Sequence, residues 1–263
     1  MAHLVAGYPD ASGCRAAARG LVEGGAAYIE VQIPFSDPSA DGPAIQSACA
    51  ASLAGTTTTA DAFALVEDLR RDYPAVPVFV MAYASLVVTP GVAAFAAKAT
   101  RAGVAGLIVP DLPFDDDEGL ATACATLGVR YGDAAPAVVS VAAPSMKLER
   151  LAAMAALGRP YLYAALRAGI TGTSTVVDDA TRSFLSACAE GGAKVLGGFG
   201  IRSGEQARAV APYVHAVVAG SVFVDAIRAV LERDAQGAYG SREARDEAIR
   251  AATMETASMI TAP

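Results

Sequence analysis

The sequence has no tryptophan, only two histidines and no excess of positive charge. Its formal net charge of −7 argues against nucleic acid or an anionic membrane as partner, because both bind a basic protein face. The four cysteines form no CxxC pair and the first residues show no signal-peptide pattern. We therefore expect reduced, buried thiols and a cytoplasmic protein. No uncharged apolar run reaches the ~18 residues that suggest a membrane span.

Aliphatic side chains dominate instead, with 54% hydrophobic and only 6% aromatic residues. This mix is typical of buried parallel sheets. Short β-rich runs alternate with Ala-rich, helix-like stretches, which predicts an α/β fold. Eight such units in 263 residues predict one closed (β/α)8 barrel, a single domain over residues 1–263. The expected strands are residues 3–6, 28–32, 76–83, 106–109, 137–141, 161–165, 194–198 and 216–219.

The stretches between these strands show helical spacing, with N-caps expected at Asp10, Thr59 and Ser203. The first strand begins almost at Met1, so we expect the N-terminal helix that would close the barrel floor to be absent. The expected helices are residues 11–24, 59–72, 91–102, 115–127, 147–157, 178–190, 203–211, 222–233 and 242–258.

Residues 28–46 place one carboxylate inside a strand and two more on the loop that follows. Ile29, Val31 and Ile33 alternate with polar residues, so their side of the strand is expected to face the helices. Glu30 then points to the enclosed side of the sheet. Burying a carboxylate is costly unless chemistry or a partner compensates. We interpret Glu30 as a catalytic residue; the alternative is a structural carboxylate paired with a neighbouring donor.

In this architecture the carboxyl ends of the strands and the loops after them form the active face. Asp41 lies on the loop after the second expected strand and is therefore a second catalytic candidate. The alternative is that Asp41 only forms a turn. Asp37 is typical of a turn former. Asp111 either supports its loop or orients a neighbour, and both remain open. Tyr83 and Tyr163 also lie at strand ends.

Glycine-bearing turns follow the last three expected strands, at residues 167–172, 197–201 and 219–221. Glycine lets the backbone approach an anion closely, and backbone N–H groups at a helix N-terminus stabilise negative charge. One such motif is usually only a turn. Three on consecutive loops, at the usual phosphate position of a barrel, predict a phosphate-binding site.

Two other reaction classes are disfavoured by where lysine and histidine fall. Lys98 and Lys147 lie in expected helices and Lys194 at the start of a strand, which leaves no lysine for a Schiff base. His3 and His215 are too few and too scattered for a catalytic zinc, so no metal is expected. What remains is carboxylate acid–base chemistry on a phosphorylated small molecule.

With these residues in view, the chain resembles the tryptophan synthase alpha chain family over nearly its whole length. The resemblance is most specific at residues 29–46, where the Glu, Pro-Phe-Ser-Asp-Pro and Ala-Asp-Gly-Pro elements keep the family's order and spacing. Further matching segments are residues 109–113, 167–172, 198–201 and 220–221.

The resemblance implies reversible retro-aldol cleavage of indole-3-glycerol phosphate into indole and glyceraldehyde 3-phosphate, in tryptophan biosynthesis. It makes Glu30 the acid–base group, Asp41 the partner of the indole N–H, and Tyr163 a support for Glu30 or the substrate. It also implies phosphate binding by Gly172, Gly200, Gly220 and Ser221, and a substrate pocket with Tyr83, Ile108 and Phe199.

The resemblance further implies a pyridoxal-phosphate beta chain as partner, in a heterotetramer of two alpha and two beta chains, with no cofactor on this chain. The sequence departs from the family's pattern at several positions. His3 stands where an aromatic residue is usual, Gln32 where glycine is common, Ser85 in place of Asn and Leu166 in place of Ser.

Two other functions stay open at this point. One is a different phosphate-binding barrel enzyme, against which the specific segment from Glu30 to Asp41 argues. The other is a weakly active or non-catalytic subunit that binds and activates a beta chain. A pure binding module has no need for a buried glutamate, which favours the lyase.

Overall fold

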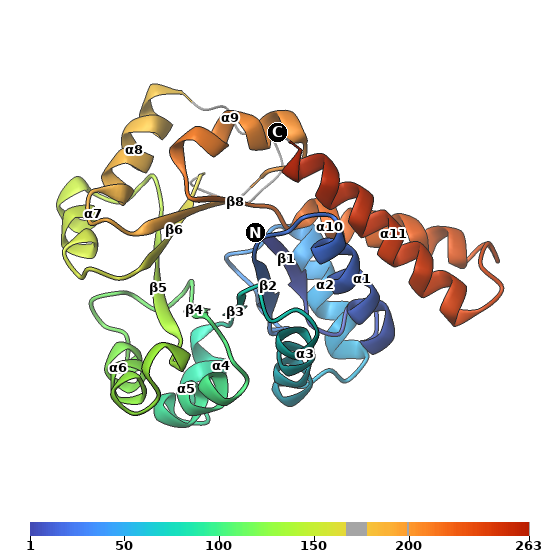
Figure 1. The fold of residues 1–263 in the computed structure, drawn as a ribbon, viewed down its shortest axis with the longest axis horizontal. Coiled ribbons are helices and arrows are strands. Elements are labelled where there is room, and N and C mark those ends of the chain that lie inside the picture. The colour runs from blue at the N-terminus through green and yellow to red at the C-terminus, as the bar shows by residue number, and fades with distance from the viewer. Residues whose placement is uncertain (167–177, 199, 263) are drawn as a thin grey trace.

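The computed structural model describes residues 1–166, 178–198 and 200–262. Within them, eight parallel strands follow one another in the order of the sequence, with helices around them (Figure 1). This confirms the predicted (β/α)8 barrel. The strands are β1 (Ala2–Val5), β2 (Ile29–Gln32), β3 (Val78–Met81), β4 (Gly106–Ile108), β5 (Ala137–Ala142), β6 (Tyr161–Ala165), β7 (Lys194–Gly198) and β8 (Ala216–Val218).

The barrel closes where β8 meets β1. Ala2 and Ala219 form a parallel bridge, the His3 N–H donates to the Ala219 carbonyl at 2.9 Å, and the Ala219 N–H donates to the Met1 carbonyl at 3.1 Å. Closure leaves no free sheet edge at this seam. It also brings His3 beside the start of the last barrel helix.

The helices pack around the outside of the strands (Figure 1). Short 3-10 turns also occur at Gly132–Ala134 and Ala211–Tyr213. The helices are α1 (Ala11–Glu23), α2 (Pro43–Ala54), α3 (Thr59–Asp72), α4 (Ala84–Val88), α5 (Val92–Arg101), α6 (Leu120–Tyr131), α7 (Leu148–Ala155), α8 (Asp179–Ala189), α9 (Gly204–Val210), α10 (Ser221–Asp234) and α11 (Arg242–Thr261).

The alternation predicted for β2 is confirmed. Ile29 and Val31 are fully buried in the core between sheet and helices, whereas Glu30 and Gln32 point to the barrel interior, where they are also buried. The register pairs Glu30 with His3 on β1 and with Phe79 on β3. Since paired residues of neighbouring strands share a face of the sheet, His3 and Glu30 both point inward.

Two helices were not predicted. Helix α2 begins within residues 28–46, at the end of the part expected to be a loop, and Pro43 is its first residue. Proline is favoured at that position, because its fixed φ suits a helix and its missing N–H would have no intrahelical partner. Helix α4 spans five residues after β3. Its N-terminus is capped from another loop, which local sequence does not reveal.

The N-cap of α3 and the start of α6 differ from the prediction for reasons of local backbone chemistry. Thr58, rather than Thr59, caps α3, and its side chain and that of Asp61 form a capping box. Helix α6 begins at Leu120, five residues later than predicted, because Glu118 and Gly119 adopt positive φ angles of 51° and 82°. The caps at Asp10 and Ser203 are confirmed.

All four cysteines are buried, free thiols, as predicted. Burial raises the pKa of the Cys14 thiol to about 11, so the reactive thiolate is scarce at neutral pH. No helix in the described parts of the chain is long and apolar enough to span a membrane.

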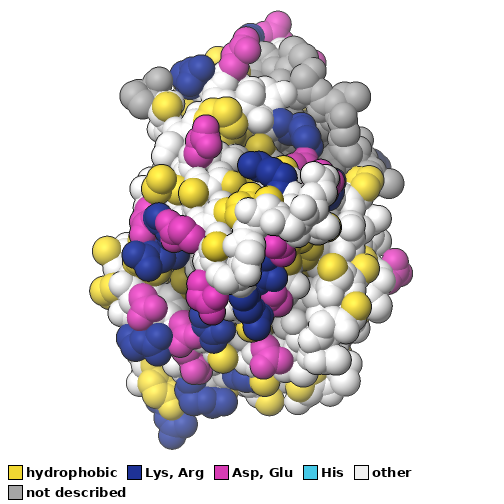
Figure 2. All heavy atoms as spheres, turned by 90° about the vertical axis from the view of Figure 1, so that its right-hand side faces the viewer, with side chains coloured by type: hydrophobic (Ala, Val, Ile, Leu, Met, Phe, Trp, Pro, Cys, Tyr) yellow, Lys and Arg dark blue, Asp and Glu magenta, His cyan; other side chains and the backbone are white. Residues whose placement is uncertain are grey.

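Figure 2 shows a face on which acidic and basic side chains are interspersed. Several ion pairs join different elements of the fold near α1 and α11. These pairs are partly exposed, so each contributes only about 0–1 kcal/mol to stability. The pairs are Arg15 with Asp68, Arg245 with Asp10, and Arg250 with Glu23.

Helices α1 and α11 pack closely because Gly20 has no side chain. A Cβ on Gly20 would lie 2.2 Å from both the Arg250 carbonyl oxygen and Thr253 Oγ1. We expect Gly20→Ala to lower the free energy of unfolding by about 1–3 kcal/mol, measured by urea denaturation. Gly128→Ala is the matched control, because that Cβ would meet only the Ala135 Cβ at 3.9 Å and the helix would gain propensity. Equal stability of the two variants would contradict the packing argument.

Candidate active site

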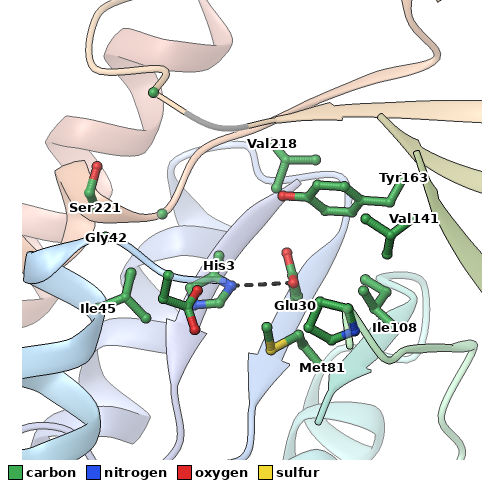
Figure 3. Close-up of a pocket in the computed structure, with 14 residues that line it drawn as sticks. His3, Glu30, Gly42, Ile45, Met81, Ile108, Val141, Tyr163, Val218 and Ser221 are labelled. Atoms are coloured by element: carbon green, nitrogen blue, oxygen red, sulfur yellow. Dashed lines mark ion pairs between the residues drawn. The ribbon is translucent and has the colours of Figure 1, made fainter. Parts of the chain in front are cut away.

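A cavity enclosing about 650 Å³ of empty space, part of it open to solvent, lies at the carboxyl ends of the strands. Its polar side chains come from β1, β2, the loop after β2, β6 and the start of α10, and the remaining wall is largely apolar (Figure 3). An apolar wall suits a flat aromatic ring. The apolar side chains are Ile45, Met81, Ile108, Val141 and Val218.

Glu30 lies in this cavity and is 2% exposed. Its Oε1 is 3.3 Å from His3 Nδ1 on the neighbouring strand (Figure 3). Burial opposes the protonation of His3, but the carboxylates of Glu30 and Asp41 outweigh it and raise the pKa of His3 above its usual value. His3 and Glu30 therefore form a close, buried pair at the centre of the site.

Asp41 also lines the cavity and is 6% exposed. Its Oδ2 accepts hydrogen bonds from Gln32 Nε2 and from the Tyr83 hydroxyl, both at 2.7 Å. Burial raises the pKa of Asp41, although these donors and His3 favour the carboxylate. Asp41 is therefore held in place by two donors while it faces the cavity.

Tyr83 fixes the loop that carries Asp41. Its hydroxyl donates to Asp41 and accepts a hydrogen bond from the Ala40 N–H at 3.0 Å. The ring of Phe35 stacks on it at a centroid distance of 5.0 Å. Burial and the nearby Asp41 carboxylate raise the pKa of Tyr83, so the phenol keeps its proton as a donor. The loop is thereby attached to β3.

The other end of the cavity is formed by Gly200, Gly220 and Ser221. Gly220 is the N-cap of the 14-residue helix α10, whose first turn contains no acidic residue. No lysine or arginine is among the described residues that line the cavity. An anion bound at this end would therefore be held by backbone N–H groups and by the partial positive charge of the helix N-terminus.

Tyr163 enters the cavity from β6 and is 8% exposed. Burial, together with the charges of Glu30 and Asp41, raises the pKa of Tyr163 well above its usual value. Gly198 makes room for this phenol, since a Cβ there would lie 2.6 Å from the hydroxyl oxygen. Figure 3 shows the Tyr163 ring and the Glu30 side chain pointing into the same space.

This site sits in a chain whose residues 1–256 match the sequence profile of the family described as tryptophan synthase alpha chain. The chain belongs to the tryptophan synthase alpha chain family. The resemblance stated from the sequence is thus confirmed.

Relatives and solved structures of the family agree over most of their length. The alpha chain of Helicobacter hepaticus is 36% identical over 230 residues, which cover 85% of this chain and 84% of the relative. The alpha chain of Laribacter hongkongensis is 40% identical over 228 residues, which cover 86% of this chain and 83% of the relative. Tryptophan synthase from Mycobacterium tuberculosis, solved in space group F222, has a TM-score of 0.80 at 32% identity and covers 100% of this chain and 92% of its own. A mutant alpha-subunit from Pyrococcus furiosus has a TM-score of 0.79 at 26% sequence identity, and the match covers 98% of this chain and 96% of its own.

In this member of the tryptophan synthase alpha chain family, most of the predicted site residues meet at one cavity. Tyr83 is not among the residues that line it; its hydroxyl holds Asp41 in place. Gly172 and Phe199 lie outside the described residues. The predicted site residues that line the cavity are Glu30, Asp41, Tyr163, Ile108, Gly200, Gly220 and Ser221. The roles implied for them by the alpha-chain resemblance stay predictions.

The two remaining acids have structural positions. Asp111 Oδ1 accepts the Ala84 N–H at 2.8 Å and so caps α4, which is the loop-supporting alternative. Asp37 is exposed, and its carbonyl accepts the Ser39 N–H at 2.8 Å, as expected of a turn former.

Sequence reasoning gave no place in the site to His3, which lines the cavity, or to Gln32, which holds Asp41. Both stand where the alpha-chain pattern has other residue types, and His3 was used only to argue against zinc. The alternation that turned Glu30 inward also applies to β1, and it would have placed His3 on the same interior face. Among the described residues, no group of three or more His, Cys, Asp or Glu is arranged to hold a metal ion.

Proposed function

We propose that the chain is the lyase that cleaves indole-3-glycerol phosphate into indole and glyceraldehyde 3-phosphate. One observation carries the proposal: two buried carboxylates, Glu30 and Asp41, share an apolar cavity with the N-terminus of α10. The apolar wall suits the indole ring and the helix N-terminus suits the phosphate. Membership in the tryptophan synthase alpha chain family supports the same reaction.

In this reaction Glu30 donates a proton to indole C3, and the ring becomes a cation with its charge at N1. Asp41 accepts a hydrogen bond from the indole N–H and stabilises that charge. Glu30, now a carboxylate, accepts the proton of the hydroxyl on the carbon attached to C3. The bond between the two carbons then breaks, its electrons return to the ring as indole, and the hydroxyl carbon becomes the aldehyde. One proton is given and one is taken back, so no net proton or cofactor is consumed.

We further propose that a tryptophan synthase beta chain, which carries pyridoxal phosphate, receives the indole, in an assembly of two alpha and two beta chains. The family name supports such a partner. The test is indole release from indole-3-glycerol phosphate by the purified chain, alone and with a beta chain, with glyceraldehyde 3-phosphate measured in parallel. Equimolar products in either condition support the lyase. No product in both conditions would refute it.

Ser221 allows a test of the phosphate end. An aspartate at the first residue of α10 favours the helix but repels a phosphate. We expect Ser221→Asp to raise KM about tenfold or more with kcat nearly unchanged, while the melting temperature stays equal or rises. Ser241→Asp, at the N-cap of α11, is the control and should leave KM unchanged. A normal KM in Ser221→Asp would remove α10 from the binding site.

A further inference from the structure

The reaction proposed above does not use His3, which lies in the cavity beside Glu30. His3 Nδ1 lies 3.3 Å from Glu30 Oε1, whereas Glu30 Oε2 is buried and has no hydrogen-bond partner among the described residues. The histidine therefore contacts Oε1 of the carboxylate and fixes the orientation of Oε2. Oε2 is the oxygen left to exchange protons with a ligand.

The second nitrogen of His3, Nε2, is also buried and makes no full hydrogen bond among the described residues, although the Gln32 side chain is near enough to favour the protonated ring. Buried polar atoms are almost always hydrogen-bonded, so an unpaired ring nitrogen in a binding cavity indicates a polar ligand group opposite it. His3 Nε2 can donate to a hydroxyl or accept from one, depending on the protonation of the ring.

The position of the ring tells which ligand group that is. Three His3 carbons, Cβ, Cγ and Cδ2, lie 3.3 Å from where a Cβ of Gly220 would be, so the ring packs on the N-cap of α10. His3 thus lies between Glu30 and the expected phosphate position. In indole-3-glycerol phosphate the carbon attached to indole is followed by a second hydroxyl-bearing carbon and then by the phosphate-bearing carbon.

We propose that His3 is a further active-site residue, which positions Glu30 through Nδ1 and binds the middle hydroxyl of the substrate's glycerol chain through Nε2. The inference rests on the proposed function, because it takes the substrate from it. It adds a specificity element: the site selects a hydroxylated chain between the ring and the phosphate.

Several titratable groups surround this histidine, and they set its charge. Glu30 comes from β2, Asp41 from the following loop and the Tyr163 phenol from β6. The Met1 amine, whose pKa burial lowers to about 6, interacts with Glu30. The two carboxylates raise the pKa of His3 despite its burial. A Glu30→Gln substitution removes the nearer carboxylate, so it should lower the pKa of His3.

The binding test uses two analogues that cannot be cleaved, since both lack the hydroxyl on the carbon attached to indole. One is an indole with a plain three-carbon chain ending in phosphate, and the other carries only the middle hydroxyl. The wild-type chain should bind the hydroxylated analogue about tenfold or more tightly than the plain one, measured as Kd by calorimetry. Equal affinities would overturn the proposed contact.

Two substitutions separate the two roles of the ring. The His3→Asn amide can reach Glu30 in place of Nδ1 but has no atom in place of Nε2, so this variant should lose the preference for the hydroxyl. The His3→Gln amide nitrogen can replace Nε2, so this variant should keep the preference while kcat falls because Glu30 is no longer held. His215→Gln, which alters the exposed histidine, is the control. Equal behaviour of Asn and Gln would contradict the assignment.

Nuclear magnetic resonance gives a measurement that does not depend on turnover. The chain has two histidines, so two imidazole signals titrate, and His215→Gln assigns them. The His3 pKa should fall in Glu30→Gln. If the wild type releases no indole but this coupling and the analogue preference are present, the proposed lyase fails while the His3 site stands. If indole is released but the His3 pKa does not fall in Glu30→Gln and the hydroxylated analogue is not preferred, the inference about His3 is wrong.

Discussion

Glu30→Gln should bind indole-3-glycerol phosphate with close to wild-type affinity and lose kcat by about 10²–10⁴-fold. Glutamine keeps the shape of the side chain and can still accept a hydrogen bond from His3. It cannot give a proton to indole C3 or accept the hydroxyl proton. Because Glu30 is 2% exposed and lies inside the barrel, water has little room to replace it. The measurement is single-turnover indole release beside the Kd of the uncleaved substrate.

The control for this experiment is Glu67→Gln, the same change on an exposed position of α3. It should leave kcat and Kd unchanged. Glu30→Gln also leaves the imidazole without its carboxylate partner, so its melting temperature should be measured to show that the protein is folded. Wild-type turnover in a folded Glu30→Gln protein would exclude Glu30 as the acid–base group.

The barrel and the position of Glu30 could be predicted because both follow from local periodicity. A strand places alternate side chains on opposite faces, so the apolar Ile29 and Val31 are enough to turn Glu30 inward. Parallel strands joined by helices then require that their carboxyl ends meet at one face. No knowledge of long-range contacts is needed for either step.

The partners of the site residues depend on contacts between distant segments, and these could not be predicted. The resemblance implied a place for Tyr83 in the pocket wall, whereas its hydroxyl donates a hydrogen bond to Asp41, 42 positions earlier in the chain. The pair of His3 with Glu30 depends on the register of β1 against β2. Register is decided by packing of whole strands, which a single sequence shows only indirectly.

Asp41→Asn should lower kcat/KM by about 10²–10³-fold, as expected when a group that stabilises developing charge is removed. Asp41 Oδ2 accepts from two donors, Gln32 Nε2 and the Tyr83 hydroxyl. An asparagine must either turn its NH₂ group toward these donors, which leaves them unpaired, or turn it toward the cavity. In the second case a donor faces the indole N–H, so binding and charge stabilisation both suffer.

Tyr83→Phe tests whether Asp41 acts through its fixed position. It removes one of the two donors and the tether to Ala40, but keeps the carboxylate. We expect a smaller loss of kcat/KM, about tenfold. The double variant should lose little more than Asp41→Asn alone, because the hydroxyl acts through a carboxylate that is already gone. Fully additive losses would show that Tyr83 acts on the substrate independently.

The pH dependence of Tyr83→Phe should show in which direction the pKa of Asp41 moves. Burial raises the pKa of Asp41, and the Tyr83 hydroxyl opposes that rise by favouring the carboxylate. Removing the hydroxyl therefore raises the pKa of Asp41 further, and the carboxylate is lost at a higher pH as the solution is acidified. The acid limb of kcat/KM should move to higher pH in Tyr83→Phe and should be absent or displaced in Asp41→Asn. If the acid limb stays at the same pH in both variants, it belongs to another group, and the titration of Asp41 does not affect the rate.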